Sequence, residues 1–147
     1  MRFSAVLFDL FGTLVPNFPE TAFKASLHDM AEILCIDPVK FHRAWAFETW
    51  RDRATGAYAT IEANLIAICS LLDTSASKDQ LECATQCRIA FTRSVLRPRH
   101  DALALLSELR SRKISLGLVS DCSAEVPAIW PELPFAPLFQ ETASRAC

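Results

Sequence analysis

Two short runs of almost continuous apolar residues stand apart from the rest of the chain, one near the start and one late in the sequence. Residues 3–8 are rich in aromatic and branched side chains and end at Asp9, and residues 114–119 end at Ser120 and Asp121. Apolar runs of this length, without polar alternation, are typical of strands that are covered on both faces, as in parallel sheets. We therefore expect residues 3–8 and 114–119 to form buried, adjacent, parallel strands.

The residues between these two runs carry a helical pattern instead. Apolar residues recur at three-to-four spacing through most of residues 19–95, as on the buried face of a helix. Asp37-Pro38 is a start signal, because proline is favoured at the first position after an N-cap. Ser77 with Gln80 fits a capping box at the start of a later helix. These signals predict a bundle of four helices.

The last third of the chain returns to mixed elements. Residues 98–112 predict a helix before the second apolar run, and residues 123–130 predict a short helix after it. We expect a weak strand at residues 135–139 and no strand in the polar tail that follows. The order of elements indicates an α/β fold, with a helix-covered parallel sheet and a helical insertion.

Composition and charge narrow the class of protein. The chain is 51% apolar and 22% charged, which is typical of a globular protein. Its net charge of -2 and its lack of basic runs argue against nucleic acid as a partner, and no apolar stretch approaches the roughly 18 residues of a membrane helix. The six irregularly spaced cysteines suit reduced thiols, so we expect a cytoplasmic protein.

Asp9 is the first candidate for chemistry. A carboxylate at the C-terminal end of a buried parallel strand lies where open α/β sheets place their ligands. Gly12 permits a tight turn behind it, and Thr13 offers a hydroxyl and a backbone N–H. The alternative is that Asp9 only ends the strand and accepts local hydrogen bonds.

The second candidate segment closes the second apolar run. Ser120 and Asp121 follow the strand directly and precede a predicted helix, an arrangement that can bind an anion. The alternative is that Asp121 or Ser123 simply caps that helix.

Together the two segments resemble the first two motifs of the haloacid dehalogenase-like (HAD) hydrolase superfamily. The resemblance rests on the sequence FDLFGTL at residues 8–14 and on the later apolar strand that ends in Ser120. It implies a partial Rossmann-like parallel sheet core formed by residues 1–16 and 96–147. It also implies that residues 17–95 are an inserted helical cap.

The resemblance assigns roles to the candidate residues. Asp9 would be the catalytic nucleophile, which forms a covalent aspartyl intermediate that water then hydrolyses. Gly12, Thr13, Ser120 and Asp121 would bind a small anionic substrate. A Mg²⁺ ion would be held by the carboxylate of Asp9 and the backbone carbonyl of residue 11, which is Phe11 in this sequence.

Two departures from the family's first two motifs leave the substrate class open. Phosphatases of the superfamily usually carry an acid two residues after the nucleophile, where this chain has Phe11. Its dehalogenases carry an aromatic residue there, but they usually have Asn where this chain has Asp121. The resemblance therefore implies a small phosphorylated substrate or a 2-halo acid.

The family also has a third motif with a Lys and a fourth motif with one or two acids, both after the second motif. Neither has a match in this sequence. Only the 26 residues 122–147 follow the second motif, they contain no lysine, and their acids are Glu125, Glu132 and Glu141. We therefore expect a form truncated after the second motif, with negligible phosphatase turnover and an exposed sheet edge that favours self-association. The alternatives are a catalytically inactive product of the same lineage and an unrelated helical binding module.

Three arginines in the expected helical cap are weaker candidates. Arg43, Arg51 and Arg53 lie close together in the sequence, and one of them could reach an anionic substrate. The alternative is that all three lie on a solvated helix face.

Overall fold

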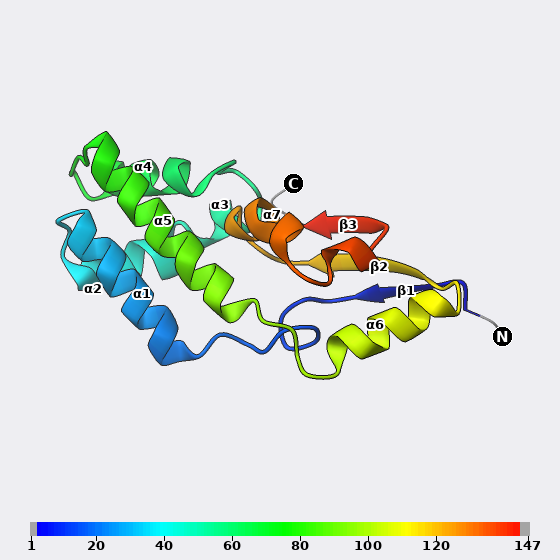
Figure 1. The fold of residues 1–147 in the computed structure, drawn as a ribbon. Coiled ribbons are helices and arrows are strands. Elements are labelled where there is room, and N and C mark those ends of the chain that lie inside the picture. Colours follow the sequence, from blue (N-terminus) through cyan, green and yellow to red (C-terminus); the bar gives the residue numbers. More distant parts are fainter. Residues whose placement is uncertain (1–2, 145–147) are drawn as a thin grey trace.

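A three-stranded parallel sheet forms one part of the protein. The structure, a computed structural model, describes residues 3–144. The strands are β1 (Ala5–Phe8), β2 (Ser115–Ser120) and β3 (Glu141–Ser144), in the order β1-β2-β3. Phe8 pairs with Leu118, and all pairings are parallel (Figure 1). The expected adjacent, parallel pairing of the two apolar runs is confirmed.

The third strand lies in the segment for which no strand was expected. A 3₁₀ turn at Ala136–Leu138 replaces the strand predicted at residues 135–139, and that prediction is wrong. The polar tail pairs with β2 instead, with Glu141 opposite Gly117. Just before this strand, Gln140 donates its N–H to the carbonyl of Leu116 at 3.1 Å, and its side-chain Oε1 accepts from the Leu116 N–H at 2.6 Å. Phe135 is fully buried in the core, so its segment supplies packing rather than pairing.

Residues 20–95 are mostly helical, and we call them the helical bundle. It contains α1 (Glu20–Ile33), α2 (Pro38–Arg43), a π-helical turn (Ala44–Glu48), α3 (Trp50–Ala54), α4 (Ile61–Leu71) and α5 (Lys78–Val95). Both expected start signals are confirmed. The Asp37 side chain accepts from the N–H groups of residues 39 and 40, and Ser77 and Gln80 form a complete capping box.

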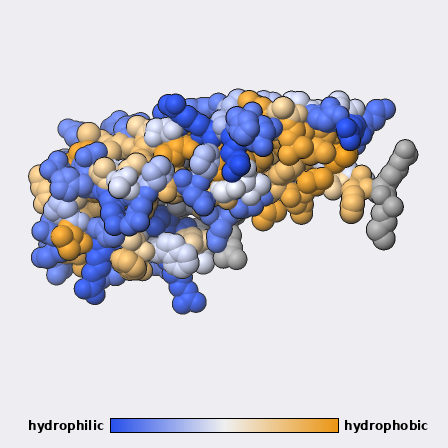
Figure 2. All heavy atoms as spheres, turned by 90° about the horizontal axis from the view of Figure 1, so that it is seen from below, coloured by the Kyte–Doolittle hydropathy of each residue, from blue (hydrophilic) through white to orange (hydrophobic). Residues whose placement is uncertain are grey.

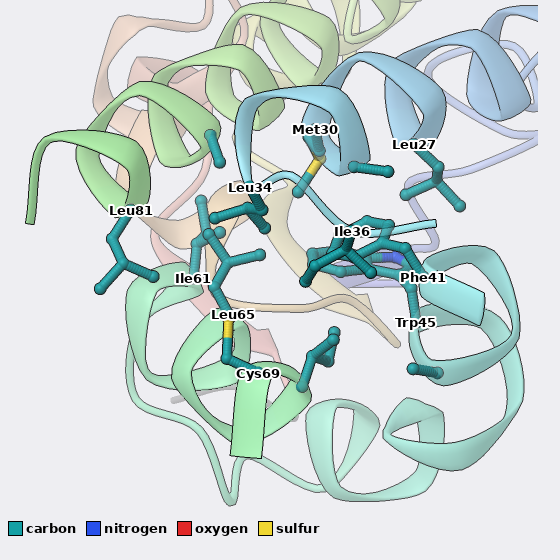
Figure 3. Packing of buried hydrophobic residues seen from close by; sticks show 14 residues of the cluster. Leu27, Met30, Leu34, Ile36, Phe41, Trp45, Ile61, Leu65, Cys69 and Leu81 are labelled. Atoms are coloured by element: carbon teal, nitrogen blue, oxygen red, sulfur yellow. The ribbon is translucent and has the colours of Figure 1, made fainter. Parts of the chain in front are cut away.

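Two clusters of buried apolar residues divide the protein. One lies within the helical bundle, where residues of α1, α2, α4 and α5 pack together with Trp45 of the π-helical turn (Figure 3). The other lies between the sheet and α6 (Ala102–Ser111), α7 (Glu125–Ile129) and the turns that follow α7. Ile89 of α5 packs against both clusters. Among residues 3–144, no helix combines the length and the apolar character needed to cross a membrane.

One face of the sheet is open to solvent, which corrects the expected burial of residues 3–8. Leu7 is 71% exposed, and Val119 on the same face is also exposed. Helices α6 and α7 share a buried cluster with Leu116 and Leu118, on the opposite face. The apolar run in β1 is therefore covered on one side only, and Figure 2 shows apolar side chains gathered at this end of the molecule.

Candidate functional site

The turn after β1 carries the first candidate residues. Its backbone is fixed by hydrogen bonds from the N–H of Gly12 to the Val15 carbonyl at 2.8 Å and from the N–H of Leu14 to the Leu10 carbonyl at 2.9 Å. Gly12 has φ +75°, a left-handed conformation that favours glycine. Leu10, Leu14 and Val15 are buried and anchor the turn.

The candidate residues of this turn are exposed to solvent. Asp9, Gly12 and Thr13 are all exposed, so a ligand can reach the Asp9 carboxylate from outside. Because β1 and β2 are parallel and Phe8 pairs with Leu118, Asp9 and Ser120 lie at the same edge of the sheet. The catalytic and binding roles of these residues stay predictions.

Ser120 is buried at the end of β2. It is 3% exposed, and its hydroxyl has no hydrogen-bond partner among residues 3–144. A buried polar group without a partner is costly, and it often marks a position that a ligand or water completes. Asp121, the next residue, is exposed.

A cavity of about 260 Å³ lies where the helical bundle meets the sheet. Its walls are Phe11, Phe18, Arg88, Asp121, Cys122, Ser123, Glu125 and Val126. It joins the turn after β1 to the loop after β2, and Phe11 and Asp121 both line it. The rings of Phe11 and Phe18 meet edge to face at 4.7 Å and form an aromatic side of the cavity.

Beside this cavity lies a buried ion pair that the sequence did not reveal. Arg88 of α5 donates to Oε1 of Glu125 of α7 through Nη2 at 2.7 Å and through Nε at 2.9 Å. The side chains are only 4% and 3% exposed. The Arg88 guanidinium also lies over the rings of Phe23, Trp45 and Phe91, at 5.1–5.4 Å from their centres. The pair therefore ties the helical bundle to the segment after β2.

The Arg88 charge controls the protonation of Glu125. Burial by itself raises the pKa of this carboxyl group, because it disfavours the charged form. The positive charge of Arg88, hydrogen bonds from its guanidinium and from the backbone, and the charge of Arg53 together outweigh burial and lower the pKa. Glu125 is therefore held as a carboxylate.

The three arginines of the bundle differ sharply in their surroundings. Arg43 is exposed and pairs with Glu48 at 2.9 Å, and Arg51 is also exposed. Arg53 is buried, and burial lowers its pKa to about 10. Of the three, Arg53 alone lines a cavity beside the loop after β2. The expectation of a solvated face holds for the first two only.

The residues expected to hold Mg²⁺ form a partial set. Magnesium sites usually use one or two carboxylates together with substrate phosphates and water. Asp9 would supply one carboxylate, the smallest number in that range, and the Phe11 carbonyl would add one further oxygen. Among residues 3–144, no group of three or more His, Cys, Asp or Glu side chains is placed to hold a metal ion.

Comparisons with known proteins find similar folds but no similar sequences. No family model and no curated protein matches the chain. A HAD family enzyme from Bacteroides thetaiotaomicron has 16% identity and a TM-score of 0.63, with 99% of this chain and 70% of that one covered. The HAD-hydrolase YfnB from Bacillus subtilis, bound to magnesium, has 17% identity and a TM-score of 0.56, with 98% and 66% covered.

A third similar structure carries a ligand. It is a mutant of CbbY from Rhodobacter sphaeroides in complex with xylulose-(1,5)bisphosphate, with 17% identity, a TM-score of 0.52, and 97% of this chain and 64% of that chain covered. The chain thus spans between 64% and 70% of the length of these three structures. At such low identity the likeness concerns the fold. The protein has the α/β fold of HAD-like enzymes, as the two sequence motifs imply.

Proposed function

We propose that the protein is a HAD-like hydrolase that acts through Asp9 on a small phosphorylated or 2-halo acid substrate. The observation that carries this proposal is the meeting of two motifs at one sheet edge. Asp9 directly follows β1 and Ser120 ends β2 in parallel register, within a HAD-like fold. In this proposal residues 1–16 and 96–147 form the core, and residues 17–95 form its helical cap.

The proposed reaction starts with attack by a carboxylate oxygen of Asp9. That oxygen forms a bond to the phosphorus or to the halogen-bearing carbon, while the leaving group departs with its bonding electrons. Water then hydrolyses the intermediate, an acyl phosphate in the first case and an aspartyl ester in the second, and restores the carboxylate. The exposure of Asp9 supports this role, since the substrate must reach it. The buried Ser120 hydroxyl and the Thr13 hydroxyl would bind the anionic group of the substrate.

A Mg²⁺ ion is proposed to assist only a phosphorylated substrate. When bound by the Asp9 carboxylate and the Phe11 carbonyl, it would offset the charge of the phosphate. The protein's own residues still position the substrate.

The two substrate classes differ in what they need from residue 11. An alkoxide leaving group needs a proton, which Phe11 cannot supply, whereas a halide leaves without one. The packing of Phe11 against Phe18 makes this side of the cavity aromatic, which favours the 2-halo acid. The bisphosphate bound by CbbY, a protein of similar fold, favours the phosphorylated substrate. Both classes therefore enter the test.

Asp9→Asn is expected to abolish any turnover, because the amide is a poor nucleophile. For the unchanged chain we expect negligible phosphate release from aryl phosphates with Mg²⁺, because Phe11 supplies no general acid and, among residues 3–144, no group of three or more His, Cys, Asp or Glu side chains is placed to hold the metal ion. Halide release from 2-chloropropionate needs neither. The measurement is phosphate and chloride release by both proteins, with Asp79→Asn, on the exposed first turn of α5, as a matched control.

Each outcome of this assay bears on the assignment. Turnover that persists in Asp9→Asn would show that Asp9 is not the nucleophile. Robust aryl phosphate turnover that disappears in Asp9→Asn would keep the nucleophile and show that Phe11 does not limit the reaction. Chloride release lost in Asp9→Asn and kept in Asp79→Asn would support the 2-halo acid.

A further inference from the structure

A cavity of about 180 Å³ lies between α7 and the strands β2 and β3, and we call it the Trp130 pocket. Figure 1 shows α7 near the ends of these two strands. Its walls include Leu118, Ser120, Val126, Pro127, Trp130 and Thr142. Of the residues 3–144 that line it, none is charged and none belongs to the turn after β1. The pocket is therefore a neutral site that does not include Asp9.

The two strands direct one face toward this pocket. Leu118 and Ser120 are two residues apart on β2, so their side chains point to the same face of the sheet, and both are buried. Thr142 pairs with Leu118 in parallel register, which puts its side chain on that face as well. Thr142 is exposed, however. The pocket is thus closed at β2, and a small molecule can reach it from the side of β3.

The indole of Trp130 is held beside the pocket by other aromatic rings. Its centre lies 5.4 Å from the ring centre of Phe135 and 5.7 Å from that of Phe139. Such tilted and edge-to-face contacts are favourable, and Trp130 would lose them if it turned into the pocket. The cavity is therefore preformed, and one of its walls is aromatic.

One polar group inside the pocket has no partner. The Ser120 hydroxyl is buried, and no residue among 3–144 forms a hydrogen bond with it. A serine hydroxyl can donate one hydrogen bond and accept two. Leaving it unpaired in apolar surroundings is costly, and a ligand with a hydroxyl of its own would pair it. The pocket thus offers one hydrogen-bonding position among apolar walls.

The volume of the pocket limits the size of the ligand. Cavities of about 150 Å³ with apolar walls bind benzene in another protein, so about 180 Å³ accommodates one aromatic ring with a small substituent. Most sites for larger ligands have roughly 300–1,000 Å³. Charged groups are disfavoured as well, because the described walls supply no counter-charge for a group that leaves water.

We propose that the Trp130 pocket binds a small, neutral, single-ring aromatic alcohol, whose hydroxyl pairs with Ser120. The ring fills the apolar space beside Trp130 and Val126. This inference goes beyond the proposed function, because the ligand carries no anionic group and does not react at Asp9. It also gives the unpaired Ser120 hydroxyl a partner that does not depend on turnover.

Three probes of similar size test the chemistry of the ligand. Phenol has the ring and the hydroxyl and is neutral at pH 7, toluene carries a methyl group in place of the hydroxyl, and benzoate is charged. Binding is read by NMR from the indole N–H of Trp130 and from NOEs between the probe and the methyl groups of Val126. We expect phenol to bind about threefold to tenfold more tightly than toluene, because of the additional hydrogen bond. Benzoate should not bind.

Two variants test the location of the ligand. Thr142→Phe fills the pocket from its exposed rim and should weaken phenol binding by at least about tenfold, because the ring loses its space. Thr21→Phe makes the same change at an exposed residue of α1 that does not line the pocket, and it should bind phenol as the unchanged protein does. Ser120→Ala should weaken the binding of phenol and leave that of toluene unchanged. Thermal unfolding first confirms that each variant folds.

Each outcome supports or overturns the inference. It would be overturned by the lack of a saturable shift at Trp130 with phenol, or by equal affinities in Thr142→Phe and Thr21→Phe. Phenol and toluene that bind equally well, or benzoate that binds as tightly as phenol, would reject the proposed class of ligand. The comparison of the three probes needs no variant, so it decides the class even if Thr142→Phe does not fold. Phenol binding should persist in Asp9→Asn, which separates this inference from the proposed hydrolase.

Discussion

Glu125→Ala is expected to destabilise the protein by about 3–5 kcal/mol, the usual cost of removing one partner from a buried ion pair. The change leaves the Arg88 guanidinium inside the protein without its carboxylate, with Phe23, Trp45 and Phe91 around it. It also removes the two hydrogen bonds that join α5 to α7. Because natural domains have only about 5–15 kcal/mol of stability, the loss is large.

The exposed pair between Arg93 and Glu132 gives a matched control. It joins α5 to the 3₁₀ turn after α7 with two similar hydrogen bonds of 2.8 and 2.9 Å, but its side chains are 51% and 52% exposed. Solvent screens such pairs, so Glu132→Ala should cost far less stability than Glu125→Ala. Urea unfolding of both variants at pH 7 measures the difference. Equal losses of unfolding free energy in the two variants would mean that burial does not determine how strongly an ion pair of α5 stabilises the protein.

Acidification is expected to reproduce part of this loss in the unchanged protein. The pKa of Glu125 is lowered in the folded state, since the charge of Arg88 and its hydrogen bonds outweigh the effect of burial. The stabilisation is therefore fully present above the pKa of an unfolded glutamate, about 4.3, and is lost as the pH falls through the lower folded value. Unfolding free energies measured from pH 7 downward should fall more steeply for the unchanged protein than for Glu125→Gln. Parallel curves would show that Glu125 contributes nothing to the acid sensitivity.

The elements that the sequence predicts correctly are those that depend on local patterns. The Ser77–Gln80 capping box and the proline after Asp37 act within one helical turn, so their spacing in the sequence is enough to place them. Strand β3 could not be found in this way. Its residues are mostly polar, and it is a strand because its backbone pairs with β2. Neither propensity nor periodicity contains that information.

The same distinction applies to the candidate site. Asp9 and Ser120 could be placed at one sheet edge because each directly follows an apolar run. The bond between Arg88 and Glu125 joins residues 37 positions apart on two helices, and no spacing rule brings them together. Arg51 and Arg53 lie two residues apart on α3 and point in different directions, and only the packing of the bundle decides that Arg53 is the buried one.

The open side of the sheet supports a last prediction, that the protein self-associates. Among residues 3–144, β1 is an edge strand, as expected, and pairs only with β2. Because strand residues alternate in direction and the Ser4 carbonyl accepts from the Ser115 N–H, the N–H and C=O groups of Leu7 point away from β2. Its side chain lies beside Gly117, where an added Cβ would come within 2.4 Å of the leucine Cδ2. The edge thus offers unpaired backbone groups next to an exposed apolar face.

We expect Leu7→Lys to suppress this association, because a lysine on an edge strand opposes further strand pairing and removes exposed apolar surface. The control is Leu71→Lys, which makes the same change at an exposed leucine at the end of α4, away from the sheet. Sedimentation velocity over a range of concentrations should show dimers or larger species for the unchanged protein and for Leu71→Lys, and monomers for Leu7→Lys. A monomer at all concentrations in the unchanged protein would contradict the prediction. Suppression by Leu71→Lys instead would move the contact from the sheet to the helical bundle.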